Sequence, residues 1–185
     1  MSSLEQSLAR RLTELRRARD WPLEELAERT GISRATLSRI ERGDTSPTAS
    51  VLGKLATAFN LSMAELFGAA STDVERLIPR AAQSVWTDPE TGYRRRVLTP
   101  SGGGYRGSMI EGTIPPGATV SYAAPPVPDL EHQLLLLEGV LRLKVGPDTY
   151  DLSPGDALRF RLNASNSYHA AGTVPARYFL TVILP

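Results

Sequence analysis

The chain has 185 residues and a formal net charge of +1, and its hydrophobic (41%) and charged (22%) fractions are ordinary, so we expect one or two globular domains. It contains no cysteine, which excludes disulfides, thiolate metal sites and cysteine nucleophiles, and only His132 and His169 are available as histidines. No apolar run approaches the roughly 20 residues of a membrane span, and residues 1–15 lack an apolar signal core, so we expect a cytoplasmic protein without membrane contact.

Helical periodicity extends over residues 1–68 and predicts five helices. Leucines recur along one side of the first helix, at Leu4, Leu8, Leu12 and Leu15. The other four helices each follow a residue that suits a helix N-terminus: Pro22, Ser33, Thr48 and Ser62. Five helices of this length bury a compact core, so residues 1–68 are expected to form a domain.

The segment 31–43 predicts a tight turn and a short helix, with Leu37 and Ile40 on its buried side. The exposed side then carries small or basic residues: Arg34, Ala35, Ser38, Arg39 and Arg42. Such a helix fits the DNA major groove, where arginine pairs bidentately with guanine. The sequence therefore predicts double-stranded DNA as a partner, although the arginines of the first helix are interpreted as a solvated surface.

Residues 69–84 are predicted to be a linker in which Val74, Leu77 and Ile78 form one helical turn before Pro79. From Val85 onward, short strands alternate with glycine and proline turns, a pattern that indicates a sandwich or barrel. The predicted strands include 93–98, 109–114, 134–137, 140–145, 149–152, 157–162 and 177–184, and 134–137 is interpreted as core. We therefore expect a second domain over residues 85–185.

Residues 8–67 resemble the Xre/Cro type of helix-turn-helix domain, on motifs at 23–27, 31–33, 37–43 and 46–48. The resemblance implies a five-helix, lambda-repressor-like fold whose third helix lies in the major groove. It implies base contacts from Arg34, Ala35, Ser38 and Arg39, a helix cap with nearby phosphate at Ser33, and backbone contacts from Arg42, Thr45 and Ser46. It also implies a structural role for Glu41.

Residues 110–184 resemble a cupin, a double-stranded β-helix barrel, on motifs at 114–117, 131–141 and 152–160. Metal-dependent cupins carry a His-x-His pair and a Glu in the first motif and a His in the second. Here no imidazole falls within 125–128, His132 takes the Glu position, and Asn166 takes the second His position. We therefore expect no bound metal, no other cofactor and no catalytic residue, because three or four ligands cannot be assembled.

Polar residues at inward barrel positions nevertheless form a possible effector site: Tyr122, His132, Arg159, Asn166 and Tyr168. Such a set could bind a small anionic or zwitterionic molecule. The alternative is structural, because a lone barrel histidine is commonly hydrogen-bonded and tyrosine favours strands regardless of function.

A helix-turn-helix domain followed by a cupin resembles a large class of bacterial repressors. The resemblance implies a sequence-specific transcriptional regulator, not an enzyme, whose barrel binds a small-molecule effector without metal. We expect a homodimer on a palindromic operator with half-sites about one helical turn apart. Two alternatives stay open: a metal-dependent cupin oxygenase or epoxidase fused to a helix-turn-helix domain, and a regulator whose barrel serves only dimerisation.

Overall fold

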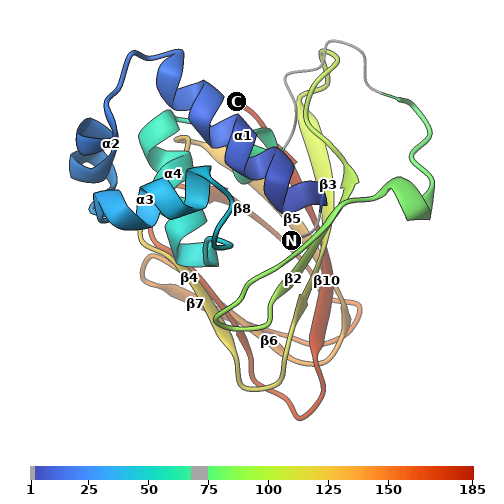
Figure 1. Ribbon diagram of the computed structural model, residues 1–185. Helices are drawn as coiled ribbons and strands as arrows, with labels where there is room; N and C mark the ends of the chain where they lie inside the picture. Colours follow the sequence, from blue (N-terminus) through green and yellow to red (C-terminus); the bar gives the residue numbers. More distant parts are fainter. Residues whose placement is uncertain (1–2, 68–74) are drawn as a thin grey trace.

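A computed structural model describes residues 3–67 and 75–185, and within them the α-helices gather at one end of a strand-rich part (Figure 1). The helices are α1 (Ser3–Arg17), α2 (Leu23–Thr30), α3 (Arg34–Glu41), α4 (Ala49–Phe59), α5 (Met63–Phe67) and the short 3-10 helix η1 (Arg80–Ala82). The strands are β1 (Val85–Thr87), β2 (Arg94–Thr99), β3 (Gly107–Ile114), β4 (Thr119–Tyr122), β5 (Leu130–Glu138), β6 (Leu141–Val145), β7 (Asp148–Leu152), β8 (Ala157–Leu162), β9 (Asn166–Ala170) and β10 (Ala176–Ile183). The predicted helical and strand-rich parts are both confirmed.

The helix N-termini follow the local chemistry of the sequence. The Ser33 hydroxyl accepts a hydrogen bond from the Thr36 backbone N–H at 3.2 Å, and Thr48 caps α4 in the same way. Ser62 and Glu65 cap α5 reciprocally: each backbone N–H donates to the other residue's side-chain oxygen, at 2.7 and 3.2 Å. These bonds satisfy N–H groups that a helix end otherwise leaves unpaired.

Arg16 and Glu41 form an ion pair that joins α1 to the end of α3. The Arg16 Nε and Nη2 atoms donate to the two Glu41 oxygens at 2.7 and 2.8 Å. This hydrogen bond raises the pKa of Arg16. The structural role expected for Glu41 is therefore supported, whereas the interpretation of the first-helix arginines as solvated surface is wrong for Arg16, whose side chain is 14% exposed.

The strand-rich part consists of two antiparallel sheets, with strand orders β1-β2-β3-β10-β5-β8 and β4-β9-β6-β7. The sheets face each other across a core, where Tyr168 of one sheet stacks on Tyr178 of the other with ring centroids 5.8 Å apart. This arrangement is the predicted cupin-like fold. The interpretation of 134–137 as core is only half right, because side chains alternate along β5: Leu134 and Leu136 are buried while Leu135 is exposed.

The helical turn expected before Pro79 is absent from the described residues 75–79, and Val74 lies outside the described range. The turn instead follows the proline, as η1, with Pro79 at its N-cap. Proline restricts the residue before it to extended backbone, whereas its own fixed φ is compatible with a helix start.

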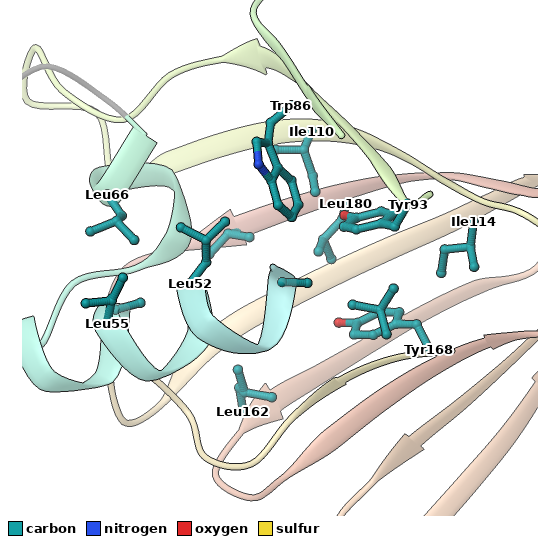
Figure 2. Packing of buried hydrophobic residues seen from close by; sticks show 14 of the residues in the cluster. Leu52, Leu55, Leu66, Trp86, Tyr93, Ile110, Ile114, Leu162, Tyr168 and Leu180 are labelled. Atoms are coloured by element: carbon teal, nitrogen blue, oxygen red, sulfur yellow. The ribbon is translucent and has the colours of Figure 1, made fainter. Parts of the chain in front are cut away.

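The helical part packs directly against the strand-rich part, and one cluster of buried side chains runs through both (Figure 2). Two hydrogen bonds cross the contact. The Trp86 indole N–H donates to the Ser46 hydroxyl at 3.3 Å, and the Ala49 N–H at the start of α4 donates to Asp88 at 3.3 Å. α4 also lies against β4. The β1–β2 hairpin and β4 therefore hold the helices that follow α3 in the chain.

Candidate functional site

The outer side of α3 carries the residues that the sequence predicts to contact DNA. Ser33, Arg34, Ala35, Arg39 and Arg42 are exposed. Together with Ser38 and residues at the start of α2, most of them line an open groove: Arg34, Ala35, Ser38, Arg39 and Arg42. Leu37 and Ile40 are buried on the opposite side of the same helix. The structure thus brings the expected groove-reading side chains together on one face, while Thr45 lies half-buried in the following loop.

The arginines of this face differ in their partners. Arg34 pairs with Glu24 of α2 at 2.5 Å, and this hydrogen bond lowers the pKa of Glu24. Arg42 donates to Asp44 at 2.8 Å and also to the Ser38 hydroxyl. Arg39 has no ion-pair partner among residues 3–67 and 75–185. Its guanidinium is therefore available to a base edge or a phosphate without first breaking an internal pair.

The structure does not bring Ser46 to this face. Its hydroxyl accepts the indole N–H of Trp86, which is 2% exposed, at the contact between the two parts of the chain. A buried indole needs such an acceptor, because an unmade hydrogen bond inside a protein is costly. The backbone contact expected from Ser46 is therefore not supported.

A cavity of about 60 Å³ lies at the junction of the helices and the barrel. The helical part contributes four lining residues: Gly53, Ser62, Met63 and Ala64. Four residues of the predicted effector set, one on each of β4 and β5 and two on β9, also line it: Tyr122, His132, Asn166 and Tyr168. The fifth, Arg159, is exposed on β8 and does not reach the cavity, because its strand neighbours Leu158 and Phe160 face inward instead.

Sequence reasoning missed Arg95, the one charged side chain lining this cavity in the described part of the chain, together with Tyr93 and Tyr178. Arg95 is the middle residue of three consecutive arginines on β2. It is 5% exposed while Arg94 is exposed, as the alternation of a strand requires. The available signal was the alternation that places Tyr93 and Arg95 on one side of the strand, but nothing local shows that this side faces the core.

The titratable groups around Arg95 are held neutral. Burial, and then the positive charge of Arg95, lowers the pKa of His132 from 6.5 to about 4. Burial also raises the pKa of each of the lining tyrosines above its usual value of 10: Tyr93, Tyr122, Tyr168 and Tyr178. At neutral pH the lining of the cavity therefore carries one positive charge and no negative charge.

These residues do not fit a metal ion. No group of three potential histidine or carboxylate ligands occurs among the described residues. The buried Asn166 Nδ2, which has no hydrogen-bond partner among the residues that the structure describes, is a donor and repels a cation. Arg95 adds a positive charge beside His132, which opposes binding of a divalent cation there. The lining is suited to hydrogen-bond acceptors and negative charge.

His132 should make the stability depend on pH. Its pKa is lower in the folded protein, so the unfolded chain takes up a proton first as the pH falls below about 6.5. The stabilising contribution is complete above pH 6.5 and is lost as the pH approaches 4. Between pH 7 and pH 4.5 we expect the unfolding free energy to fall by about 2–3 kcal/mol more for the wild type than for His132→Gln. Urea unfolding at both pH values measures the difference, and parallel curves for the two proteins would contradict it.

Comparison with known proteins assigns the helical part. Residues 12–66 match the helix-turn-helix family HTH_3. The N-terminal part of this chain is a helix-turn-helix domain. Over 191 aligned residues the chain is 26% identical to the HTH-type transcriptional regulator SutR of Escherichia coli (strain K12), covering 100% of this chain and 99% of that protein. The similarity to this regulator extends over the whole chain, and the helix-turn-helix domain implies binding to DNA.

Two solved structures share the overall fold of this helix-turn-helix protein. An HTH_3 family transcriptional regulator from Vibrio cholerae superposes with a TM-score of 0.77, at 23% identity, over 98% of this chain and 97% of that one. The hydroxypropylphosphonic acid epoxidase of S. wedmorenis superposes with a TM-score of 0.51, at 18% identity, over 97% and 98%. The architecture is thus found in a regulator and in an enzyme, so the site residues must decide between the two functions.

No helix in residues 3–67 and 75–185 is long and apolar enough to cross a membrane.

Proposed function

We propose that this protein is a sequence-specific transcriptional repressor whose barrel binds a small-molecule effector without a metal. In this proposal residues 1–68 bind DNA, 85–185 bind the effector and 69–84 connect them. Base contacts come from Arg34, Ala35, Ser38 and Arg39, and phosphate contacts from the N-terminus of α3 at Ser33 and from Arg42 and Thr45.

The observation that carries the proposal is the shared wall of the cavity. α4 and α5 of the helix-turn-helix domain line the same space as β4, β5 and β9 of the barrel. The start of α4 follows the recognition helix after a short loop and is held by Asp88. A molecule that enters the cavity therefore contacts both parts, and it can shift the DNA-binding domain only if it binds the two arrangements with different affinity.

The close approach of Gly53 and Tyr122 supports this coupling. A Cβ atom added at Gly53 would lie 2.8 Å from the Tyr122 ring, so α4 lies directly on a side chain of the cavity wall. A movement of the Tyr122 ring on effector binding is transmitted to α4 without an intervening layer. A barrel used only for dimerisation has no need of a cavity lined by Arg95, His132 and Asn166 at this position.

We propose that two copies bind a palindromic operator, since two-fold symmetric helix-turn-helix proteins place their recognition helices in major grooves about one turn apart. Sedimentation of the protein with an operator duplex measures the stoichiometry, and one chain per operator is the result that contradicts this part of the proposal.

Arg39→Ala should weaken binding to the operator by about 1–3 kcal/mol, because it removes an unpaired guanidinium from the groove-facing side of α3. The operator is first obtained by selecting bound duplexes from a random library with the wild-type protein, and affinities are measured by fluorescence anisotropy at fixed salt. Arg159→Ala is the matched control, since it removes an exposed arginine that lies far along the chain from α3. The affinity of this variant for the operator should stay within twofold of the wild-type value. An unchanged affinity of Arg39→Ala for the operator would reject the proposed DNA contact of Arg39.

A further inference from the structure

We propose that the effector is a small organic monoanion, a carboxylate with an apolar body, and that its carboxylate binds Arg95. This inference rests on the proposed role of the cavity as the effector site. It names the chemical class of the ligand and the residue that selects it.

Arg95 is a buried cation that has no counter-ion in the described part of the chain. It has no ion pair within 4.0 Å among residues 3–67 and 75–185, and its Nε and Nη2 atoms are buried without a hydrogen-bond partner. The contact that it makes is with the Phe67 ring, whose centroid lies 5.6 Å from the guanidinium carbon. Burying an unpaired charge is strongly unfavourable, so a position of this kind favours a partner from outside the described residues, and we infer that a bound ligand supplies it.

Asp88 is a buried carboxylate whose charge acts on the same tyrosines, Tyr93 and Tyr122, as that of Arg95, but it is already engaged in other hydrogen bonds. Asp88 lies in the hairpin loop that precedes β2 and is 2% exposed. Its oxygens accept hydrogen bonds from the backbone N–H groups of Ala49 and Glu90 and from the Thr91 hydroxyl. Asp88 therefore binds the start of α4 and its own loop, and it forms no hydrogen bond with the Nε and Nη2 atoms of Arg95.

The unpaired atoms of Arg95 have the geometry that a carboxylate requires. Nε and Nη2 form one edge of the guanidinium, and Arg16 uses the same edge to bind both oxygens of Glu41 at 2.7 and 2.8 Å. Two parallel N–H···O bonds to a planar carboxylate are the strong, orienting form of this interaction. A free carboxylate can occupy the Arg95 edge in the way that Glu41 occupies the edge of Arg16.

The surroundings select a single negative charge. His132 and the four lining tyrosines are neutral at pH 7, so Arg95 balances one charge and a dianion would leave a second one buried and uncompensated. The Asn166 Nδ2 atom, also buried and unpaired among the described residues, is a second donor for the same ligand.

Aliphatic side chains make up much of the remaining wall of the cavity, among them Ile110, Val120, Leu130 and Val182. The cavity of about 60 Å³ suits an anion of roughly four to six non-hydrogen atoms, because one water needs about 10–15 Å³ on this measure.

Calorimetric titration of the full chain tests the class of ligand. The probes are acetate, propionate, butyrate, isobutyrate and pyruvate, the amides of the same acids, and inorganic phosphate. We expect at least one carboxylate to bind with one site per chain, and its amide and phosphate to bind at least 30-fold more weakly. Arg95→Gln should weaken the carboxylate by at least about 30-fold, the lower bound for removing one partner of a buried charge pair. Arg94→Gln, on the exposed side of the same strand, should stay within twofold.

A second variant checks that Arg95 is uncompensated in the free protein. Arg95→Met keeps much of the volume and removes the charge, so the thermal midpoint without ligand should rise by roughly 2–8 °C. Adding the carboxylate that stabilises the wild type should not raise the thermal midpoint of this variant further. A lower midpoint for Arg95→Met would mean that the charge is already balanced, and would overturn the inference.

The outcomes separate this inference from the proposed function. Amides that bind as tightly as the acids, with Arg95→Gln unaffected, would overturn the carboxylate assignment and leave the cavity as an effector site. Tighter binding of phosphate than of any carboxylate would overturn the assignment of the ligand as a carboxylate with an apolar body. If no probe binds while the wild type still binds its operator, the inference is wrong and the DNA-binding part of the proposed function stands. A wild-type protein that binds no operator is a separate result, and it contradicts the DNA-binding part of the proposed function.

Discussion

Arg16→Ala is expected to lower the unfolding free energy by about 3 kcal/mol, near the lower end of the range for breaking a buried ion pair. Glu41 would then keep a charge at a side chain that is only 9% exposed, with both oxygens deprived of their bidentate partner. Arg16 also donates to the Trp21 carbonyl at 2.8 Å, so the turn between α1 and α2 loses a hydrogen bond as well. Equilibrium urea unfolding followed by circular dichroism measures the loss.

Arg10→Ala is the matched control for this prediction. Arg10 lies on the same helix, is 74% exposed and approaches Glu14 only to 4.0 Å. Exposed pairs of this kind contribute about 0–1 kcal/mol, so the variant should unfold almost as the wild type does. Equal stabilities for the two variants would show that the Arg16–Glu41 pair does not hold α1 against α3.

Arg16→Ala should also weaken operator binding, although Arg16 is not among the residues expected to touch bases. Glu41 is the last residue of α3, and its pair with Arg16 fixes the end of this helix, which we propose reads the operator. The double variant Arg16→Met/Glu41→Leu removes both charges together. It should recover most of the lost stability, since replacing a buried pair by apolar side chains is often neutral or stabilising. A double variant as unstable as Arg16→Ala would contradict this account of the loss.

Gly112→Ala is expected to destabilise the barrel by about 2–3 kcal/mol, because it forces an extra atom into a filled space. The added Cβ would lie 2.3 Å from the ring carbon Cζ of Tyr178. That ring has little freedom to move, since it is 2% exposed, stacks on Tyr168 and donates a hydrogen bond to the Tyr93 hydroxyl at 3.3 Å. Thermal and urea unfolding measure the change in stability.

Gly107→Ala, on the same strand, is the control for this substitution, because a Cβ at Gly107 meets nothing within 4 Å. It should unfold as the wild type does. A double variant with Tyr178→Ala should be more stable than the sum of the two single changes implies, since the clash needs both side chains. If the two changes in stability are strictly additive, the clash with the Tyr178 ring is not the cause of the destabilisation by Gly112→Ala.

The sequence alone determined the elements whose signals are local. Ser33, Thr48 and Ser62 cap the helices that they were expected to start, because a cap bonds to an N–H only two or three positions along the chain. The apolar spacing of Leu37 and Ile40 also fixed which side of α3 is buried and left its arginines outward. The helix-turn-helix domain and the alternation of short strands with turns were therefore predictable.

Only the tertiary structure decided which side chains meet. Arg95 and not Arg159 lines the cavity, and Ser46 bonds to Trp86, 40 residues away, instead of facing outward. Tyr178 meets Tyr93 across 85 residues of chain. The pattern of a strand specifies that its two sides differ, but it does not specify which other elements cover each side. The packing of the helices against the strands supplies that information, and it brings separate polar residues together around one cavity whose lining carries a single positive charge.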